Sequence, residues 1–105
     1  MTITRDFKET IKARAQADPA FRSALLSEAI EVLLADDLQT GKSVLRDYIN
    51  ATIGFEALAI QSGLNAKSLM RMFSKSGNPR ADNLFKVIAA LQKSEGIQLA
   101  VSAAA

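Results

Sequence analysis

The chain contains no cysteine and no histidine among its 105 residues. Without cysteine there are no disulfide bonds and no thiolate nucleophiles, and without histidine the imidazole base and most zinc ligands are missing. There is also no run of about 18 apolar residues and no basic leader before an apolar stretch with a cleavage site. We therefore expect neither a membrane span nor a secretory signal, and a cytoplasmic protein.

The reactive side chains that remain form no catalytic pattern. Asp36 and Asp37 are adjacent in the sequence, so they are not oriented as a catalytic pair. There is no glycine-rich phosphate loop, and the serines have no histidine base. We expect the protein not to be an enzyme and to need no cofactor or metal ion.

What the chain does have is apolar residues and an uneven distribution of charge. Hydrophobic residues make up 49% of the sequence, which is ample for the core of one domain. Residues 1–37 carry five basic and seven acidic side chains, whereas residues 60–105 carry six basic and two acidic ones. This asymmetry favours an acidic half that meets protein and a basic half that meets an anion, and a chance imbalance on solvated faces explains the charge equally well.

Apolar periodicity and capping residues predict a series of helices. Thr4 is a candidate cap for the first helix, Asp18 before Pro19 marks the start of the second, and residues 36–41 are expected to form a polar connection. The predicted helices cover residues 5–16, 19–35, 42–52, 55–61, 66–73 and 81–93.

Two of these helices are short and are joined by a glycine-containing turn. Gly63 is expected to need a positive φ there, and Asn65 to cap the second of the two helices. Such an arrangement is a helix-turn-helix, which occurs in DNA-binding proteins and also in proteins that never bind DNA. On the second helix Leu69, Met72 and Phe73 share an inward face, and Leu64 before it is expected to fill the angle between the two helices.

The opposite face of that helix suits the major groove of DNA. Arg71 could pair with guanine O6 and N7, and Lys67 could reach the same acceptors or a phosphate. Asn65 is expected to favour a phosphate oxygen, and the residues beyond the helix to hold the backbone. The alternative is a solvated cationic face on an ordinary helical bundle. The candidate DNA-binding residues are Asn65, Ala66, Lys67, Ser68, Arg71, Lys75, Ser76 and Arg80.

The run over residues 54–91 resembles the Cro/repressor-type (Xre-like) helix-turn-helix family. The shared pattern is a leucine-alanine pair, a glycine four residues after that alanine, a recognition helix and a proline-led final helix. More narrowly, the Gly-Asn-Pro at 77–79 and the trailing residues 97–101 resemble the antitoxins of toxin–antitoxin operons and related prophage DNA-binding proteins. The resemblance implies base contacts from Ala66, Lys67 and Arg71, and backbone contacts from Asn65, Lys75 and Ser76.

Two positions depart from the family pattern. Phe55 stands where the first helix of the motif usually opens with a polar residue, which removes an expected phosphate contact. In most of the family an acidic residue closes the recognition helix. Here Phe73 replaces it, and the antitoxin branch shows the same replacement.

The last residues show a different period. Ile97, Leu99 and Val101 alternate with more polar or smaller residues, a pattern that suits a short strand. A lone strand needs a partner, so the segment is a candidate dimer element. The expected fold is all-α: a five- to six-helix bundle with the helix-turn-helix, plus this strand. We expect one globular unit with a helical extension over 1–40, the helix-turn-helix domain over 41–96 and a strand or tail over 97–105.

The sequence thus favours a homodimeric regulator that binds operator DNA, namely an antitoxin that represses its own promoter and binds a toxin protein. A phage-type repressor without a toxin is one alternative. Another is an interaction module in which the helix-turn-helix is only a scaffold. In that case the stripe of Phe7, Ile11 and Ala15 on the first helix would meet a protein partner.

Overall fold

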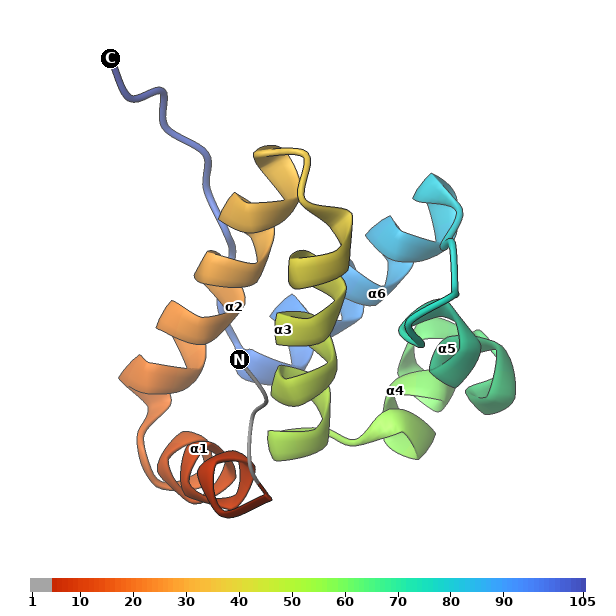
Figure 1. Ribbon diagram of the computed structural model, residues 1–105, viewed down its shortest axis with the longest axis horizontal. Coiled ribbons are helices and arrows are strands. Elements are labelled where there is room, and N and C mark those ends of the chain that lie inside the picture. The colour runs from red at the N-terminus through yellow and green to blue at the C-terminus, as the bar shows by residue number, and fades with distance from the viewer. Residues whose placement is uncertain (1–4) are drawn as a thin grey trace.

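The computed structural model describes the backbone of residues 5–105 and the side chains of residues 9–105, and it confirms the all-α class (Figure 1). Thr4, the candidate cap, and the side chain of Phe7 lie outside what is described. None of the helices over residues 5–105 is both long enough and apolar enough to cross a membrane. The helices in chain order are α1 (Arg5–Ala17), α2 (Pro19–Leu34), α3 (Leu38–Ala51), α4 (Phe55–Ser62), α5 (Ala66–Met72) and α6 (Ala81–Glu95).

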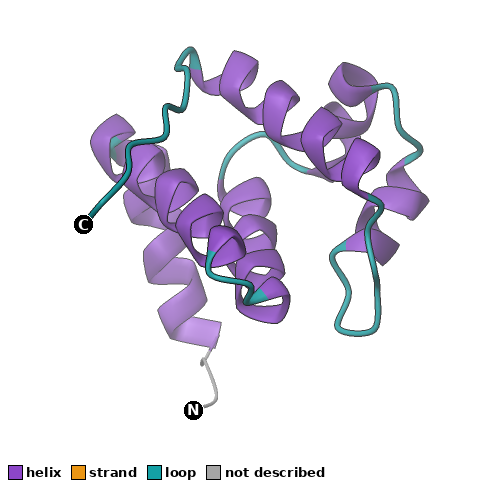
Figure 2. Ribbon diagram, turned by 90° about the horizontal axis from the view of Figure 1, so that it is seen from above, coloured by secondary structure: helices purple, strands orange, loops and turns teal. Residues whose placement is uncertain are grey.

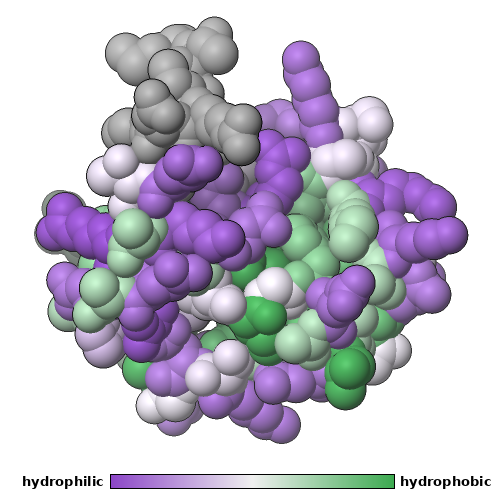
Figure 3. All heavy atoms as spheres, turned by 90° about the horizontal axis from the view of Figure 1, so that it is seen from below, coloured by the Kyte–Doolittle hydropathy of each residue, from purple (hydrophilic) through white to green (hydrophobic). Residues whose placement is uncertain are grey.

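The helices surround α3, which lies at the centre of the molecule. In Figure 1, α2 runs beside α3, α1 crosses below them, and α4 and α5 lie on the opposite side with α6 behind. Eleven of the residues whose side chains are described form the central cluster of the core, and α2 contributes to it together with the helices predicted for DNA binding. From below, apolar side chains gather near the middle of the face among polar ones (Figure 3). The core residues are Leu26, Ala29, Leu45, Tyr48, Ile49, Leu58, Leu69, Phe73, Val87, Ala90 and Leu91.

Capping residues explain where two of the helices begin. The side chain of Asp18 accepts hydrogen bonds from the N–H groups of Ala20 and Phe21 at 3.0 and 3.3 Å, as predicted for the start of α2. Asp37 does the same for α3 through the N–H of Thr40 at 3.1 Å. The polar connection expected over 36–41 is present but shorter than predicted, covering residues 35–37, because the cap turns the residues after Asp37 into the first turn of α3.

Gly41 lies inside α3 for a packing reason. A Cβ atom added at this position would lie 2.7 Å from Cγ of Leu33 on α2. The absence of a side chain therefore lets α2 and α3 approach closely, which offsets the unfavourable helix propensity of glycine.

The strand expected near the C-terminus is absent from the described chain, in which no segment is drawn as a strand (Figure 2). Gly96 ends α6 in the left-handed region at φ 73°, as predicted. The N–H of Leu99 then donates to the side-chain oxygen of Gln92 at 2.7 Å, and Ile97 and Leu99 pack against the core. The alternating pattern thus places two residues inward and leaves Val101 82% exposed, because no neighbouring strand is there to pair with it.

A polar cluster joins four helices at the end of the core. Arg22 Nε lies 3.0 and 2.9 Å from the two carboxylate oxygens of Glu95, and Tyr48 donates its hydroxyl to Glu95 at 2.9 Å. Arg22 also donates to the carbonyl of Ala15 at the end of α1 at 2.8 Å. Burial, followed by the hydrogen bond to Glu95, raises the pKa of Tyr48 well above its ordinary value.

We expect Tyr48→Phe to lower the free energy of unfolding by about 1–2 kcal/mol at neutral pH, because a buried hydrogen bond to a carboxylate is lost. The pKa of Tyr48 is higher in the folded protein than in the unfolded chain, where it is about 10. The contribution of Tyr48 to the free energy of unfolding is therefore fully present below about pH 10 and is lost as the pH rises from there through the higher pKa of the folded protein. Urea unfolding at several pH values should show the two proteins converging above about pH 10, and a constant difference would contradict the assignment.

Candidate nucleic-acid interface

The two short helices and the turn predicted in the middle of the chain are present. Gly63 ends α4 at φ 75°, and its N–H donates to the carbonyl of Ala59 at 3.0 Å. A Cβ atom at Gly63 would meet nothing within 4 Å, so the glycine is required by the backbone conformation and not by crowding. Leu64 follows and packs partly buried against the core.

Asn65 caps α5 as predicted. Its side-chain oxygen accepts hydrogen bonds from the N–H groups of Lys67 and Ser68 at 2.9 and 3.2 Å. Those two backbone donors are therefore already satisfied within the protein. The side-chain amide nitrogen of Asn65 is the group that remains to meet a phosphate.

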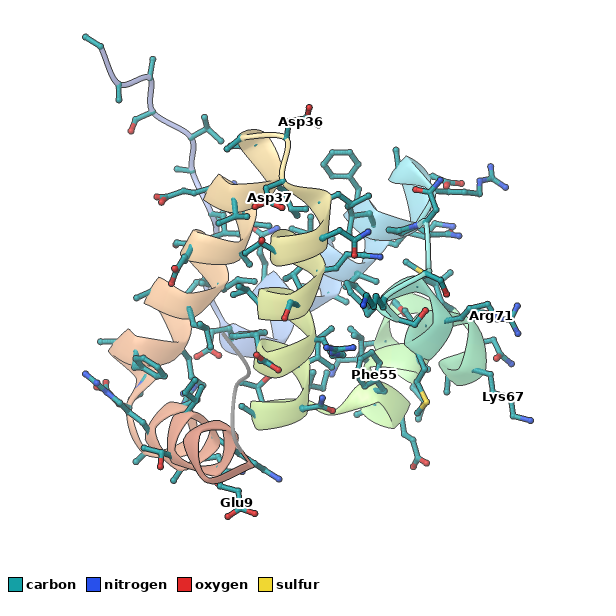
Figure 4. All side chains as sticks on the ribbon, in the orientation of Figure 1. Glu9, Asp36, Asp37, Phe55, Lys67 and Arg71 are labelled. Carbon is teal, nitrogen blue, oxygen red and sulfur yellow. The ribbon has the colours of Figure 1, made fainter. Side chains whose placement is uncertain are left out.

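The two sides of α5 differ as the spacing predicted. Leu69 is fully buried, and Phe73 just beyond the helix is 1% exposed. On the other side Lys67, Ser68 and Arg71 are exposed, and in Figure 4 Lys67 and Arg71 point away from the protein. We call the outward side formed by Lys67, Ser68 and Arg71 the α5 face.

Other residues on and next to α5 are partly buried, half-exposed or packed against each other. Ala66 is partly buried, and Met70 is 51% exposed. The ring of Phe55 lies 6.1 Å from that of Phe73, at a tilt of 55°. The two phenylalanines that depart from the family pattern thus pack on each other and fix α4 against the end of α5.

The segment after α5 brings several of the predicted residues together. Ser68, Arg71, Ser76 and Arg80 line one hollow, together with the turn that contains Gly77. Lys75 is exposed and lines a different hollow on the side of α3. The structure therefore divides five of the predicted residues between two hollows that meet at residues 75 and 76, and the other three, Asn65, Ala66 and Lys67, line neither hollow.

Arg80 has an acidic neighbour. Its Nε lies 3.4 Å from a carboxylate oxygen of Asp82, and the two side chains are 79% and 55% exposed. A solvent-exposed pair of this kind is weak and easily broken. Asp82 nevertheless reduces the positive charge that Arg80 presents.

Lys42 was not predicted as a functional or structural residue, yet it positions the end of α5. It is 2% exposed, and its ammonium donates to the backbone carbonyls of Ser74, at 2.9 Å, and of Gly77. Arg46, one turn further along α3, donates to the carbonyl of Phe73 at 3.4 Å. The two cations thus donate to carbonyls at and just beyond the end of α5, near the negative end of its dipole. The carbonyl of Ser74 also accepts from the N–H of Gly77 at 3.1 Å. A signal was present in the sequence, since Lys42 shares the spacing of Leu45 and Ile49.

Gly77 packs directly against the backbone of the last turn of α5. A Cβ atom at this position would lie 2.8 Å from the carbonyl oxygen of Met72 and closer still to that of Arg71. Only glycine lets the chain return this closely to the last turn of α5.

Comparison of the chain with protein-family models, with curated proteins and with solved structures finds no match. The resemblance to the Cro/repressor-type family therefore stays a prediction. Among the described side chains there is also no group of three or more carboxylates placed to hold a metal ion.

We expect Lys42→Met to lower the free energy of unfolding by about 1–3 kcal/mol, because the carbonyl of Gly77 loses its donor and the carbonyl of Ser74 keeps only the N–H of Gly77. The control is Lys75→Met, which removes the same charge from an exposed side chain and should change stability by less than about 0.5 kcal/mol. Urea unfolding followed by circular dichroism measures both variants. Equal losses would mean that Lys42 does not hold the segment after α5.

Proposed function

We propose that the protein is a sequence-specific DNA-binding transcriptional regulator that places α5 in the major groove as the recognition helix of a helix-turn-helix. The observation that carries the proposal is the α5 face. Its three polar side chains are exposed, while Leu69 and Phe73 on the opposite side are buried and fix the helix in the core. A short helix held in this way presents its outer side chains in a defined direction, as base recognition requires.

The chemistry of the α5 face fits base edges. The guanidinium of Arg71 has the fork geometry that pairs with O6 and N7 of guanine, and Lys67 can donate to the same acceptors or to a phosphate. Ser68 can donate or accept. Ala66 is small, so the first turn of α5 can approach the bases or a thymine methyl group closely.

The residues after α5 supply contacts to the DNA backbone in this proposal. Lys75 and Ser76 are exposed next to the end of the helix, and Arg80 shares a hollow with Arg71. Contacts to phosphates position a protein on DNA and make its affinity depend on salt. Arg80 contributes less than the others because Asp82 lies beside it.

We further propose that the protein acts as a homodimer. With 7 residues, α5 can read only a few base pairs, so tight and specific binding calls for two half-sites. Repression of its own promoter as the antitoxin of a toxin–antitoxin operon is supported by the resemblance of residues 77–79 and 97–101. A phage-type repressor without a toxin is the alternative, and co-purification with the product of a neighbouring gene separates the two.

The scaffold-only alternative receives less support from the described side chains. Ala15 is fully buried and Ile11 is partly buried, so this part of the stripe on α1 is directed into the protein. A partner protein that used it would have to displace α1 from α3.

The proposal is tested by a gel-shift assay with the DNA upstream of the gene, at low and at moderate salt. We expect retardation whose affinity falls steeply with salt, because several cations meet phosphates. Absence of retardation at low salt, by protein shown to be folded, would refute the proposal.

Arg71→Ala should weaken binding to the preferred sequence by about tenfold to a hundredfold and should relax the choice of base at one position of each half-site. The reason is the loss of the bidentate hydrogen bonds that Arg71 would donate to one guanine. Selection from a randomised DNA library measures this directly. The matched control is Arg14→Ala on α1, an exposed arginine remote from α5, which should leave the selected sequence unchanged.

Lys75→Ala should weaken binding to all sequences about equally and lower the salt dependence by about one phosphate contact. Lys93→Ala removes the same charge from an exposed position near the end of α6 and serves as its control. A change in sequence preference caused by Lys75→Ala would contradict the assignment of this residue to the backbone.

A further inference from the structure

A second cationic hollow lies beside the α5 face, between the first half of α3 and the segment that follows α5. It has a volume of about 210 Å³, enough for several water molecules of about 30 Å³ each or for one phosphate group. We call it the α3 hollow. Its lining includes Gln39, Lys42, Ser43, Arg46, Ser74 and Lys75.

The charge of the α3 hollow is of one sign. Lys42, Arg46 and Lys75 each carry a positive charge, and none of the described residues that line the hollow is acidic. The groups that accept hydrogen bonds from Lys42 and Arg46 are backbone carbonyls, which are dipoles without net charge. Arg46 also lines a neighbouring hollow that contains Glu9 and Asp47, which reduce the positive potential around it. The α3 hollow itself, lined by three cations and no described carboxylate, keeps a net positive charge that an anion would neutralise.

The hydrogen-bonding groups of the α3 hollow are suited to phosphate oxygens. Arg46 has five N–H donors, and its one hydrogen bond within the described protein is long, at 3.4 Å. Ser43 and Gln39 add a hydroxyl and an amide on the same side of α3, one turn apart. Planar guanidinium groups surrounded by neutral donors are typical of phosphate sites in proteins.

Lys75 connects this hollow to the surface proposed for DNA. It lines the α3 hollow, and the next residue, Ser76, lines the hollow that Arg71 shares. A DNA strand that follows the segment after α5 would thus pass from one hollow to the other.

We propose that the α3 hollow binds a phosphate group and that, resting on the proposed function, this phosphate belongs to the DNA backbone beside the bases read by α5. Ser43, Arg46 and Lys75 donate hydrogen bonds to the phosphate oxygens. Lys42, which is buried, adds positive charge to the α3 hollow without contacting the phosphate. In consequence α3, which lies outside the helix-turn-helix, adds a phosphate contact to each half-site.

The location of the site is tested by NMR titration of the folded wild-type protein with an operator duplex and, separately, with inorganic phosphate. We expect the amide of Ser43 and the side-chain Nε–H of Arg46 to shift with the duplex at protein concentrations where the α5 face also shifts. Shifts with inorganic phosphate but not with DNA would support a site for a free phosphate compound and overturn its assignment to the backbone. No shift of Ser43 and Arg46 with either probe would overturn the site altogether.

A charge substitution tests the contribution to affinity. Ser43→Asp places a carboxylate in the α3 hollow and should weaken DNA binding about tenfold and reduce its salt dependence by about one phosphate contact. Ser102→Asp makes the same change of net charge in the exposed C-terminal segment and should have a much smaller effect. Unfolding measurements on both variants show whether each remains folded. If Ser43→Asp does not fold, Ser43→Ala takes its place, because it removes the hydroxyl from the α3 hollow without adding a charge.

The two proposals fail in different ways. If Arg71→Ala weakens binding while Ser43→Asp behaves like Ser102→Asp, the α3 hollow is not a phosphate site and the DNA-binding function stands. If the wild-type protein retards no DNA, the function proposed above is refuted, and the titration with inorganic phosphate still decides whether the hollow binds an anion.

Discussion

The two hydrogen bonds donated by the buried ammonium of Lys42 hold the segment after α5 to α3, and the orientation of α5 depends on them. Ser74 and Gly77, whose carbonyls accept these bonds, are separated from Lys42 by 32 and 35 residues. Bonds to a charged donor are stronger than neutral ones and are costly to break when buried. Gly77 makes the contact possible, because any side chain there would collide with the last turn of α5.

This arrangement gives α3 a double role. Its apolar side contributes Leu45, Tyr48 and Ile49 to the core, and its cationic residues near the start fix the helix proposed for DNA recognition. The position of α5 therefore depends on the core of the whole protein and not on the short turn at Gly63 alone. A helix of only 7 residues is marginally stable alone, so its position is set by the contacts that it makes with the rest of the protein.

Features set by neighbouring residues could be predicted from the sequence, and features set by distant ones could not. The caps at Asp18 and Asn65, the positive φ of Gly63 and the two sides of α5 follow from local spacing, and the structure has each of them. The early start of α3 was missed because two adjacent aspartates and a glycine are also typical of a loop. The C-terminal strand was wrong because an alternating pattern fits either a strand or a segment that buries every second residue against helices.

The candidate site shows the same division. Exposure of Lys67, Ser68 and Arg71 was predictable from helical geometry, whereas the pairing of Lys42 with carbonyls far along the chain required the tertiary structure. The separation of Lys75 from Arg71 and Arg80, which line a different hollow, was equally hidden, because it depends on how the chain turns after α5.

The ion pair between Arg22 and Glu95 has a consequence for the order in which the protein acquires its structure during synthesis. The two residues are 73 positions apart, so α6 must have left the ribosome before the carboxylate can reach α2 and the hydroxyl of Tyr48. Until then Arg22 has only its carbonyl acceptors at the end of α1, and the hydroxyl of Tyr48 lacks the carboxylate to which it donates in the finished core. Completion of this polar cluster is thereby coupled to the synthesis of α6, and a nascent chain interrupted before α6 would lack the carboxylate that joins α2 to α3.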